Sequence, residues 1–147
     1  MTNLVKADVG RFCWLDLAAT DADSAKSFYG GLFGWEPCEQ RANNGSFIRM
    51  RLSDQDVGSI YQLRDAQIDH GMPSHWTPYI RVDDLDRAAQ RVTLFGGRVI
   101  VRPFTVDGIA RIALIMDSVG ASVGLWEPIR AKEKANGHGQ INGQING

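Results

Sequence analysis

The sequence predicts an α+β fold built from two tandem βαβββ units. Three observations predict this class. A short phrase occurs twice: residues 32–35 read Leu-Phe-Gly-Trp and residues 94–97 read Leu-Phe-Gly-Gly, an offset of 62 positions (94 − 32). The same offset relates Trp14 to Trp76 and Asp21 to Asp83. In each copy a segment with strand-like alternation runs into a segment with helical spacing, and three further strand-like segments follow.

The first unit begins with a strand predicted from Phe12 to Ala18, in which side chains alternate between two faces. A helix follows, capped by Thr20 or Asp21 and ended by Gly34. Its predicted buried stripe consists of residues at helical spacing: Ala22, Ala25, Phe28, Tyr29 and Leu32. Three more strands are expected at 35–40, 46–52 and 57–63, and an Asn-Gly hairpin turn separates the first two.

The second unit repeats this plan. A strand is predicted over about 75–82 and a helix over 84–95, with Leu85 and Phe95 at the two ends of its buried stripe. Three further strands are expected at 98–102, 109–116 and 121–126.

Two segments lie outside the units. Residues 64–74 are polar and contain Gly71 and Pro73, so we expect them to connect the units. Residues 131–147 are polar and repeat Gly-Gln-Ile-Asn, a composition typical of a flexible tail. The expected organisation is therefore one domain over residues 1–130, followed by the tail. Within the domain we place the units at about 10–63 and 75–128.

Composition excludes several classes of protein. The net charge of −1 and the lack of a basic run argue against binding to nucleic acid or to an anionic membrane. No segment approaches the roughly 20 apolar residues needed to span a bilayer, and the first residues lack the apolar region of a signal peptide. Cys13 and Cys38 form no CxxC motif, and Cys13 is expected to be buried on the helix-packed face of its strand. We expect a cytoplasmic protein.

With these units the chain resembles the vicinal oxygen chelate superfamily, which includes glyoxalase I, the extradiol dioxygenases and the bleomycin-resistance proteins. The matching segments are residues 21–35, 82–97 and 117–128. The resemblance implies two curved mixed sheets that form a cup, with each helix on the convex side and a small-molecule site in the concavity. It also implies pairing of two chains, so we expect a homodimer.

The resemblance further implies where metal ligands would stand. These positions fall on Trp14, within residues 60–62, on Thr77 (or Trp76 if the offset of the repeat is kept) and on Gly124. None of them is a histidine or a carboxylate, the side chains that usually bind catalytic divalent metals. His75 and Asp16 lie close by in sequence but form an incomplete ligand set. We therefore expect no metal and no other cofactor.

The residues at and around these positions predict an aromatic pocket instead. Trp14, Tyr61, Tyr79 and Trp126 lie on strands that line the cup in this family, and Gly124 leaves space. Asp16, His75 and Thr77 would orient a ligand. The alternative is that the rings simply fill the core.

Three functions remain open from the sequence. The first is a binding protein that holds a small aromatic or apolar molecule in a metal-free cavity. The second is an enzyme of lyase, isomerase or dioxygenase type, either metal-dependent or using Asp16 or His75 as its base. The third is an interaction module closed by a second chain.

Overall fold

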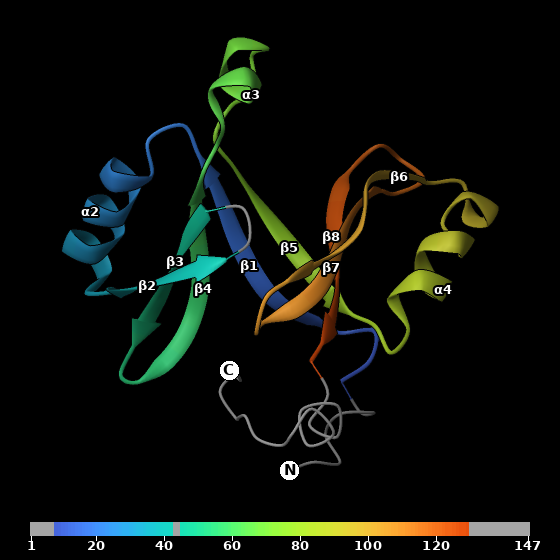
Figure 1. The fold of residues 1–147 in the computed structure, drawn as a ribbon, viewed down its shortest axis with the longest axis horizontal. Helices are drawn as coiled ribbons and strands as arrows, with labels where there is room; N and C mark the ends of the chain where they lie inside the picture. Colours follow the sequence, from blue (N-terminus) through green and yellow to red (C-terminus); the bar gives the residue numbers. More distant parts are fainter. Residues whose placement is uncertain (1–7, 43–44, 130–147) are drawn as a thin grey trace. The chain divides into compact units, whose positions relative to one another are not determined.

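The computed structural model describes residues 8–42 and 45–129 (Figure 1). The chain groups into two compact units, Trp14–Pro78 and the combination of Met1–Cys13 with Tyr79–Gly147. We call them the first and the second unit and describe each by itself. The predicted Asn-Gly turn includes residues 43–44, and the predicted tail covers 131–147, so both fall outside the described residues.

The first unit contains a four-stranded sheet in the order β2-β3-β4-β1. Strands β1 and β4 run parallel, and the other neighbours are antiparallel. The elements, in chain order, are β1 (Phe12–Ala19), α2 (Ala22–Phe33), β2 (Glu36–Ala42), β3 (Gly45–Leu52), β4 (Gln55–Gln62) and α3 (Asp65–Asp69).

The second unit repeats this arrangement with the order β5-β8-β7-β6 and a parallel β5–β8 pair. Its elements are β5 (His75–Arg81), α4 (Leu85–Arg91), the 3₁₀ turn η1 (Thr93–Phe95), β6 (Arg98–Val106), β7 (Ala110–Met116) and β8 (Ser122–Pro128). Strand β5 crosses the boundary between the units, because its residues up to Pro78 belong to the first unit. The predicted α+β class, with two βαβββ units and mixed sheets, is confirmed. The single predicted helix over 84–95 is divided, because α4 ends at Arg91 and η1 follows.

Side chains and glycines fix the helix ends. Asp21 Oδ1 accepts a hydrogen bond from the Ser24 amide at 3.0 Å, and Asp84 Oδ1 accepts one from the Arg87 amide at 3.1 Å. Helix α2 ends at Gly34, which has a φ of +79°, a conformation that glycine adopts without strain. The capping aspartates are 63 positions apart (84 − 21), so Asp84, and not Asp83, corresponds to Asp21.

The core of each unit lies between its sheet and its long helix. In the first unit it consists of Leu17, Ala19, Ala22, Ile48, Met50 and Ile60; in the second it consists of Leu85, Ala113 and Leu125. The predicted stripe of α2 is wrong at two positions, since Phe28 and Leu32 are 58% and 60% exposed. Helix α2 packs on the sheet along Ala22, Ala25 and Tyr29. Phe28 and Leu32 lie beside this line of contact.

Other sequence predictions fail for local reasons. Cys13 is exposed, because the buried part of β1 begins only at Asp16. Phe95 is also exposed, since it lies in η1 beyond the end of α4. The segment 64–74, predicted to be irregular, contains the five-residue helix α3.

Candidate functional site

The first unit carries buried polar side chains on the sheet face opposite α2. On β1, Leu17 and Ala19 pack with Ala22 of the helix. Because side chains of a strand alternate, Trp14 and Asp16 point to the other face. Strand β4 continues this face: Ser59 lies directly beside Asp16, and Tyr61 beside Ala18.

A hydrogen-bonded chain joins three of these residues. The indole Nε1 of Trp14 donates to Ser59 Oγ at 2.8 Å, and Ser59 Oγ donates to Asp16 Oδ1 at 2.6 Å. Asp16 is 9% exposed and Ser59 is 4% exposed. Burial raises the pKa of the Asp16 carboxyl to about 7, although the Ser59 hydrogen bond and the charge of His75 lower it. A carboxyl with this pKa changes its protonation state near neutral pH.

Two other predicted residues of the first unit, Tyr61 and His75, lie close enough to Asp16 to interact with it electrostatically. Burial raises the pKa of the Tyr61 hydroxyl, and the nearby charge of Asp16 raises it further. His75 Nδ1 lies 2.8 Å from the carbonyl oxygen of Pro73. A carbonyl only accepts, so Nδ1 carries a proton, and Nε2 can accept when the ring is neutral. Thr77 is buried. The first unit therefore brings Tyr61 and His75 close to Asp16, which the Ser59 hydroxyl links to Trp14.

The remaining predicted residues form a separate cluster in the second unit. Tyr79 on β5 lies beside Gly124 on β8, and its ring meets the ring of Trp126 edge-on at a centroid distance of 5.8 Å. A Cβ atom placed on Gly124 would lie 2.2 Å from Tyr79 Cδ2. The space expected above Gly124 is thus occupied by a tyrosine ring that is itself buried.

Matching hydrogen bonds show which positions of the two units correspond. Gln62 Oε1 accepts from the Ala22 amide at 2.8 Å at the start of α2. Glu127 Oε1 accepts from the Leu85 amide at 2.9 Å at the start of α4. This equivalence has an offset of 63 (85 − 22), which makes Thr77 the counterpart of Trp14. Trp76 instead donates from Nε1 to the Tyr29 hydroxyl of α2 at 3.3 Å, so it belongs to the helix side of the sheet.

Sequence reasoning missed Ser59 and Arg49. Arg49 on β3 lies beside Ser59, and Cys38 on β2 lies beside Arg49, so four side chains stand in one row across the sheet. The Arg49 guanidinium pairs with Asp56, its Nε lying 3.0 Å from Asp56 Oδ1. Strand alternation placed these residues on a face, but only the strand register shows which of them are neighbours.

Comparison with known proteins decides the family. Residues 11–123 match the model of the Glyoxalase/Bleomycin resistance protein/Dioxygenase superfamily. The chain belongs to this superfamily.

Curated relatives of this glyoxalase-superfamily protein are longer than it is. It is 35% identical over 119 residues to the putative glyoxylase CFP32 of Mycobacterium tuberculosis, a match that covers 80% of this chain and 45% of the relative. It is 32% identical over 131 residues to the anthracycline biosynthesis protein DnrV of Streptomyces peucetius, covering 80% and 46%. The chain therefore spans less than half the length of these relatives.

Solved structures share the fold at low identity. The methylmalonyl-CoA epimerase of Mycobacterium tuberculosis is 20% identical, with a TM-score of 0.63 over 86% of this chain and 91% of that one. A hypothetical protein of Bacillus halodurans is 14% identical, with a TM-score of 0.62 over 82% and 96%.

The residues of this superfamily member do not fit a divalent metal. Among the described residues, no group of three or more His, Cys, Asp or Glu side chains converges. The positions that the sequence resemblance assigns to metal ligands are Trp14, one of residues 60–62 (Ile-Tyr-Gln), Thr77 and Gly124. Their chemistry lacks the imidazole and carboxylate donors that such a site requires.

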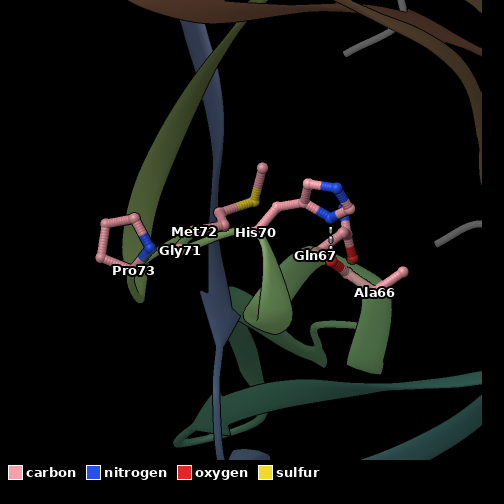
Figure 2. Close-up of a pocket in the computed structure, with 6 residues that line it drawn as sticks. All are labelled: Ala66, Gln67, His70, Gly71, Met72 and Pro73. Carbon is pink, nitrogen blue, oxygen red and sulfur yellow. Dashed lines mark hydrogen bonds between the residues drawn. The ribbon is translucent and has the colours of Figure 1, made fainter.

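An open depression lies elsewhere, on the connector that contains α3 (Figure 2). It is lined by Ala66, Gln67, His70, Gly71, Met72 and Pro73. His70 Nδ1 donates to the Ala66 carbonyl oxygen at 2.7 Å, so this imidazole is part of the local helix structure. None of the predicted site residues borders the depression, and its lining contains no Asp, Glu, Lys or Arg side chain.

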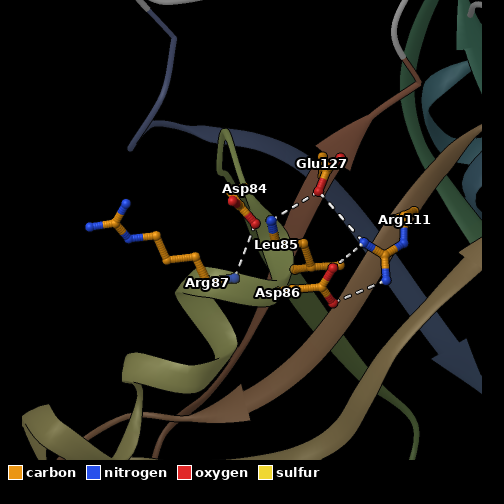
Figure 3. A network of polar contacts seen from close by, with 6 residues as sticks. All are labelled: Asp84, Leu85, Asp86, Arg87, Arg111 and Glu127. Carbon is orange, nitrogen blue, oxygen red and sulfur yellow. Dashed lines mark hydrogen bonds and ion pairs between the residues drawn. The ribbon is translucent and has the colours of Figure 1, made fainter. Parts of the chain in front are cut away.

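The polar network in Figure 3 stabilises the start of α4. Arg111 on β7 forms two hydrogen bonds with the Asp86 carboxylate, at 3.0 and 3.2 Å, and lies 3.8 Å from Glu127. The Arg111 hydrogen bonds lower the pKa of the Asp86 carboxyl. Since the carboxylates of Asp84, Asp86 and Glu127 all bind groups of the second unit, we interpret the network as structural.

Proposed function

We propose that this chain binds a small aromatic molecule without a metal, on the sheet face of the first unit around Trp14 and Asp16. The observation that carries the proposal is the buried chain from Trp14 through Ser59 to Asp16. Binding sites for small molecules combine aromatic walls with a few well-placed polar groups. Trp14 and Tyr61 supply rings here, and Asp16 supplies a polar group that changes its protonation state near pH 7.

The relatives favour a planar ligand. Two of them are named as anthracycline biosynthesis proteins. We therefore choose hydroxyanthraquinones, which are planar and carry neighbouring hydroxyl and keto groups, as the first probes. In this proposal His75 and Thr77 orient the ligand from β5. Tyr79, Gly124 and Trp126 belong to the second unit, where the Tyr79 ring fills the space above Gly124, and the proposed site does not include them.

A metal-independent isomerase is the second candidate, and Asp16 is the observation that favours it. A base with a pKa near 7 can remove a proton and return it at neutral pH. The reaction would move a proton from a carbon next to a carbonyl group to Asp16, leaving an enolate. After the Asp16 carboxyl exchanges its proton with solvent, return of a proton from Asp16 to another carbon, or to the other face, would complete the isomerisation without oxidation or reduction. His75, through Nε2, would be the alternative base.

Two measurements on purified protein test these functions. Native mass spectrometry with metal analysis should show a bound organic molecule and no stoichiometric metal. Stoichiometric zinc, iron, nickel or manganese would contradict the metal-free site. Incubation of the protein and its ligand in D₂O separates the two candidates. Deuterium incorporation by the wild-type protein but not by Asp16→Asn identifies an isomerase, and no incorporation identifies a binding protein.

We also propose a homodimer in the cytoplasm. Proteins of this superfamily often form dimers. No helix among the described residues is long and apolar enough to cross a membrane. Light scattering should give twice the 16.2 kDa of one chain. A mass of one chain at micromolar concentration would contradict the dimer.

A further inference from the structure

We propose that Ser59 is a positioning residue: held by Trp14, it fixes Oδ1 of Asp16 as a permanent acceptor and makes Oδ2 the atom that exchanges protons with a bound molecule. The hydrogen bonds from Trp14 to Ser59 and from Ser59 to Asp16 do not depend on a bound ligand. Only the role of Oδ2 toward a ligand rests on the proposed function.

The indole sets the direction of the chain. Trp14 Nε1 can only donate, so its hydrogen bond of 2.8 Å occupies a lone pair of Ser59 Oγ. Ser59 has a single hydroxyl proton, and Asp16 Oδ1 lies 2.6 Å away. The proton therefore points at Oδ1, and the short distance is typical of a hydroxyl that donates to a carboxylate.

The backbone holds the chain in place. Asp16 and Ser59 are directly paired residues of the parallel strands β1 and β4. The strands approach closely next to this pair, since a Cβ atom on Gly58 would lie 2.6 Å from the Leu15 carbonyl oxygen. Ser59 is buried, so water is not a ready alternative partner for its hydroxyl.

The groups around Asp16 come from each neighbouring strand. Ser59 and Tyr61 face it from β4, and His75 acts on it electrostatically from β5. One strand further, on β3, Arg49 lies beside Ser59 and is paired with Asp56. Helix α2 covers the opposite face. Within this set the Ser59 hydroxyl is the group hydrogen-bonded to Asp16.

This geometry defines which groups of a ligand can hydrogen-bond to Asp16. Because Oδ1 accepts from Ser59 in both protonation states, the carboxyl proton resides on Oδ2 when Asp16 is neutral. Oδ2 then donates to a keto oxygen of the ligand. When Asp16 is ionised, Oδ2 accepts from a hydroxyl group. The expected ligand class is therefore a hydroxy- or keto-substituted aromatic compound rather than a plain hydrocarbon.

Nuclear magnetic resonance on the ligand-free protein tests the positioning role. The side-chain carboxyl ¹³C signal of Asp16 should titrate with a midpoint near 7, and the indole N–H signal of Trp14, assigned with Trp14→Phe, should follow the same midpoint. Ser59→Ala should raise the Asp16 midpoint by about one pH unit, since it removes a hydrogen bond that stabilises the ionised form. Ser59→Thr keeps the hydroxyl and should therefore give the wild-type midpoint of Asp16.

An Asp16 midpoint that does not change in Ser59→Ala would overturn the proposal. If Ser59→Ala does not fold, Trp14→Phe provides the test, because loss of the indole donor weakens the next hydrogen bond and raises the midpoint by a smaller amount. An unchanged midpoint in Trp14→Phe would be equally contradictory. A confirmed titration with no hydroxyanthraquinone binding would refute the proposed function while leaving the positioning role intact.

Discussion

At the scale of single residues, Asp16 is kept at a cost in stability. Its pKa is about 7 in the folded protein and about 3.8 in an unfolded chain, so the folded state holds the proton more tightly. Stability falls with rising pH wherever the folded state binds more protons. The contribution of Asp16 is therefore most favourable below about pH 4 and declines until about pH 7. A group retained at such a cost is typical of a functional site.

Asp16→Asn should remove this pH dependence. Between pH 4 and 8, the free energy of unfolding of the variant should rise relative to wild type, by at most about 4 kcal/mol, since one pKa unit corresponds to about 1.4 kcal/mol. Urea unfolding of both proteins across this range measures the difference, in which the other titrating groups cancel. A difference that stays constant with pH would show that Asp16 is not a perturbed carboxyl.

Gly124→Ala should destabilise the protein by about 1–3 kcal/mol, because the new methyl group collides with the buried ring of Tyr79. Gly31→Ala is the matched control: it lies in α2 with nothing near its Cβ position, and alanine favours helix. Thermal unfolding compares the two variants. An equal response of both would mean that Tyr79 does not lie over Gly124.

The sequence predicts individual site residues better than their contacts. Trp14 and Asp16 follow from the alternation of one strand. Ser59, which connects them, does not, because the pairing of β1 with β4 brings together residues 43 positions apart. Similarly, Gly124 reads as open space in the sequence, and only the register of β5 and β8 shows that Tyr79 fills it.

At the scale of secondary-structure elements, each long helix begins with two matching hydrogen bonds. An aspartate caps the first turn, and a side chain from the last strand of the unit accepts from the first helical amide. That side chain is Gln62 for α2 and Glu127 for α4. Such bonds satisfy amides that have no partner within the helix.

Substitutions at Glu127 separate the contribution of this hydrogen bond from the contribution of the Glu127 charge. Glu127→Gln should cost less than about 0.5 kcal/mol, because Gln62 makes the same bond as an amide in the other unit. Glu127→Ala should cost about 1–3 kcal/mol, since it leaves the Leu85 amide without its acceptor. Chemical denaturation of the two variants measures both values. A Gln variant as unstable as the Ala variant would assign the effect to the ion pair with Arg111 instead.

The elements of regular length are predictable and the short or partly covered ones are not. Asp21 and Gly34 mark both ends of α2 in the sequence, because capping has specific residue requirements. Helix α3 has only five residues in a polar segment, too few for a helical pattern to emerge. Phe28 and Leu32 satisfy the helical period, yet they are exposed because the contact with the sheet runs along Ala22, Ala25 and Tyr29.

At the scale of the whole molecule, the repeat identifies the fold but is misleading about the site. The offset of 62 makes Trp14 and Trp76 appear equivalent. The structure shows that Trp14 bonds to Ser59 on one side of the sheet and Trp76 to Tyr29 of α2 on the other. A shift of one residue reverses the face of a strand side chain, so repeat alignment requires the helix-start contacts to fix its register.

This difference between the two tryptophans supplies the most direct test of the proposed site. Isothermal titration of hydroxyanthraquinones into Trp14→Ala and Trp76→Ala, with circular dichroism to verify folding, compares a residue of the proposed site with one on the helix side. Trp14→Ala should weaken binding by about 5- to 150-fold, because stacking of one aromatic ring on an aromatic side chain contributes about 1–3 kcal/mol. Trp76→Ala should leave the affinity unchanged. Equal affinity in Trp14→Ala and wild type would place the ligand elsewhere and contradict the account.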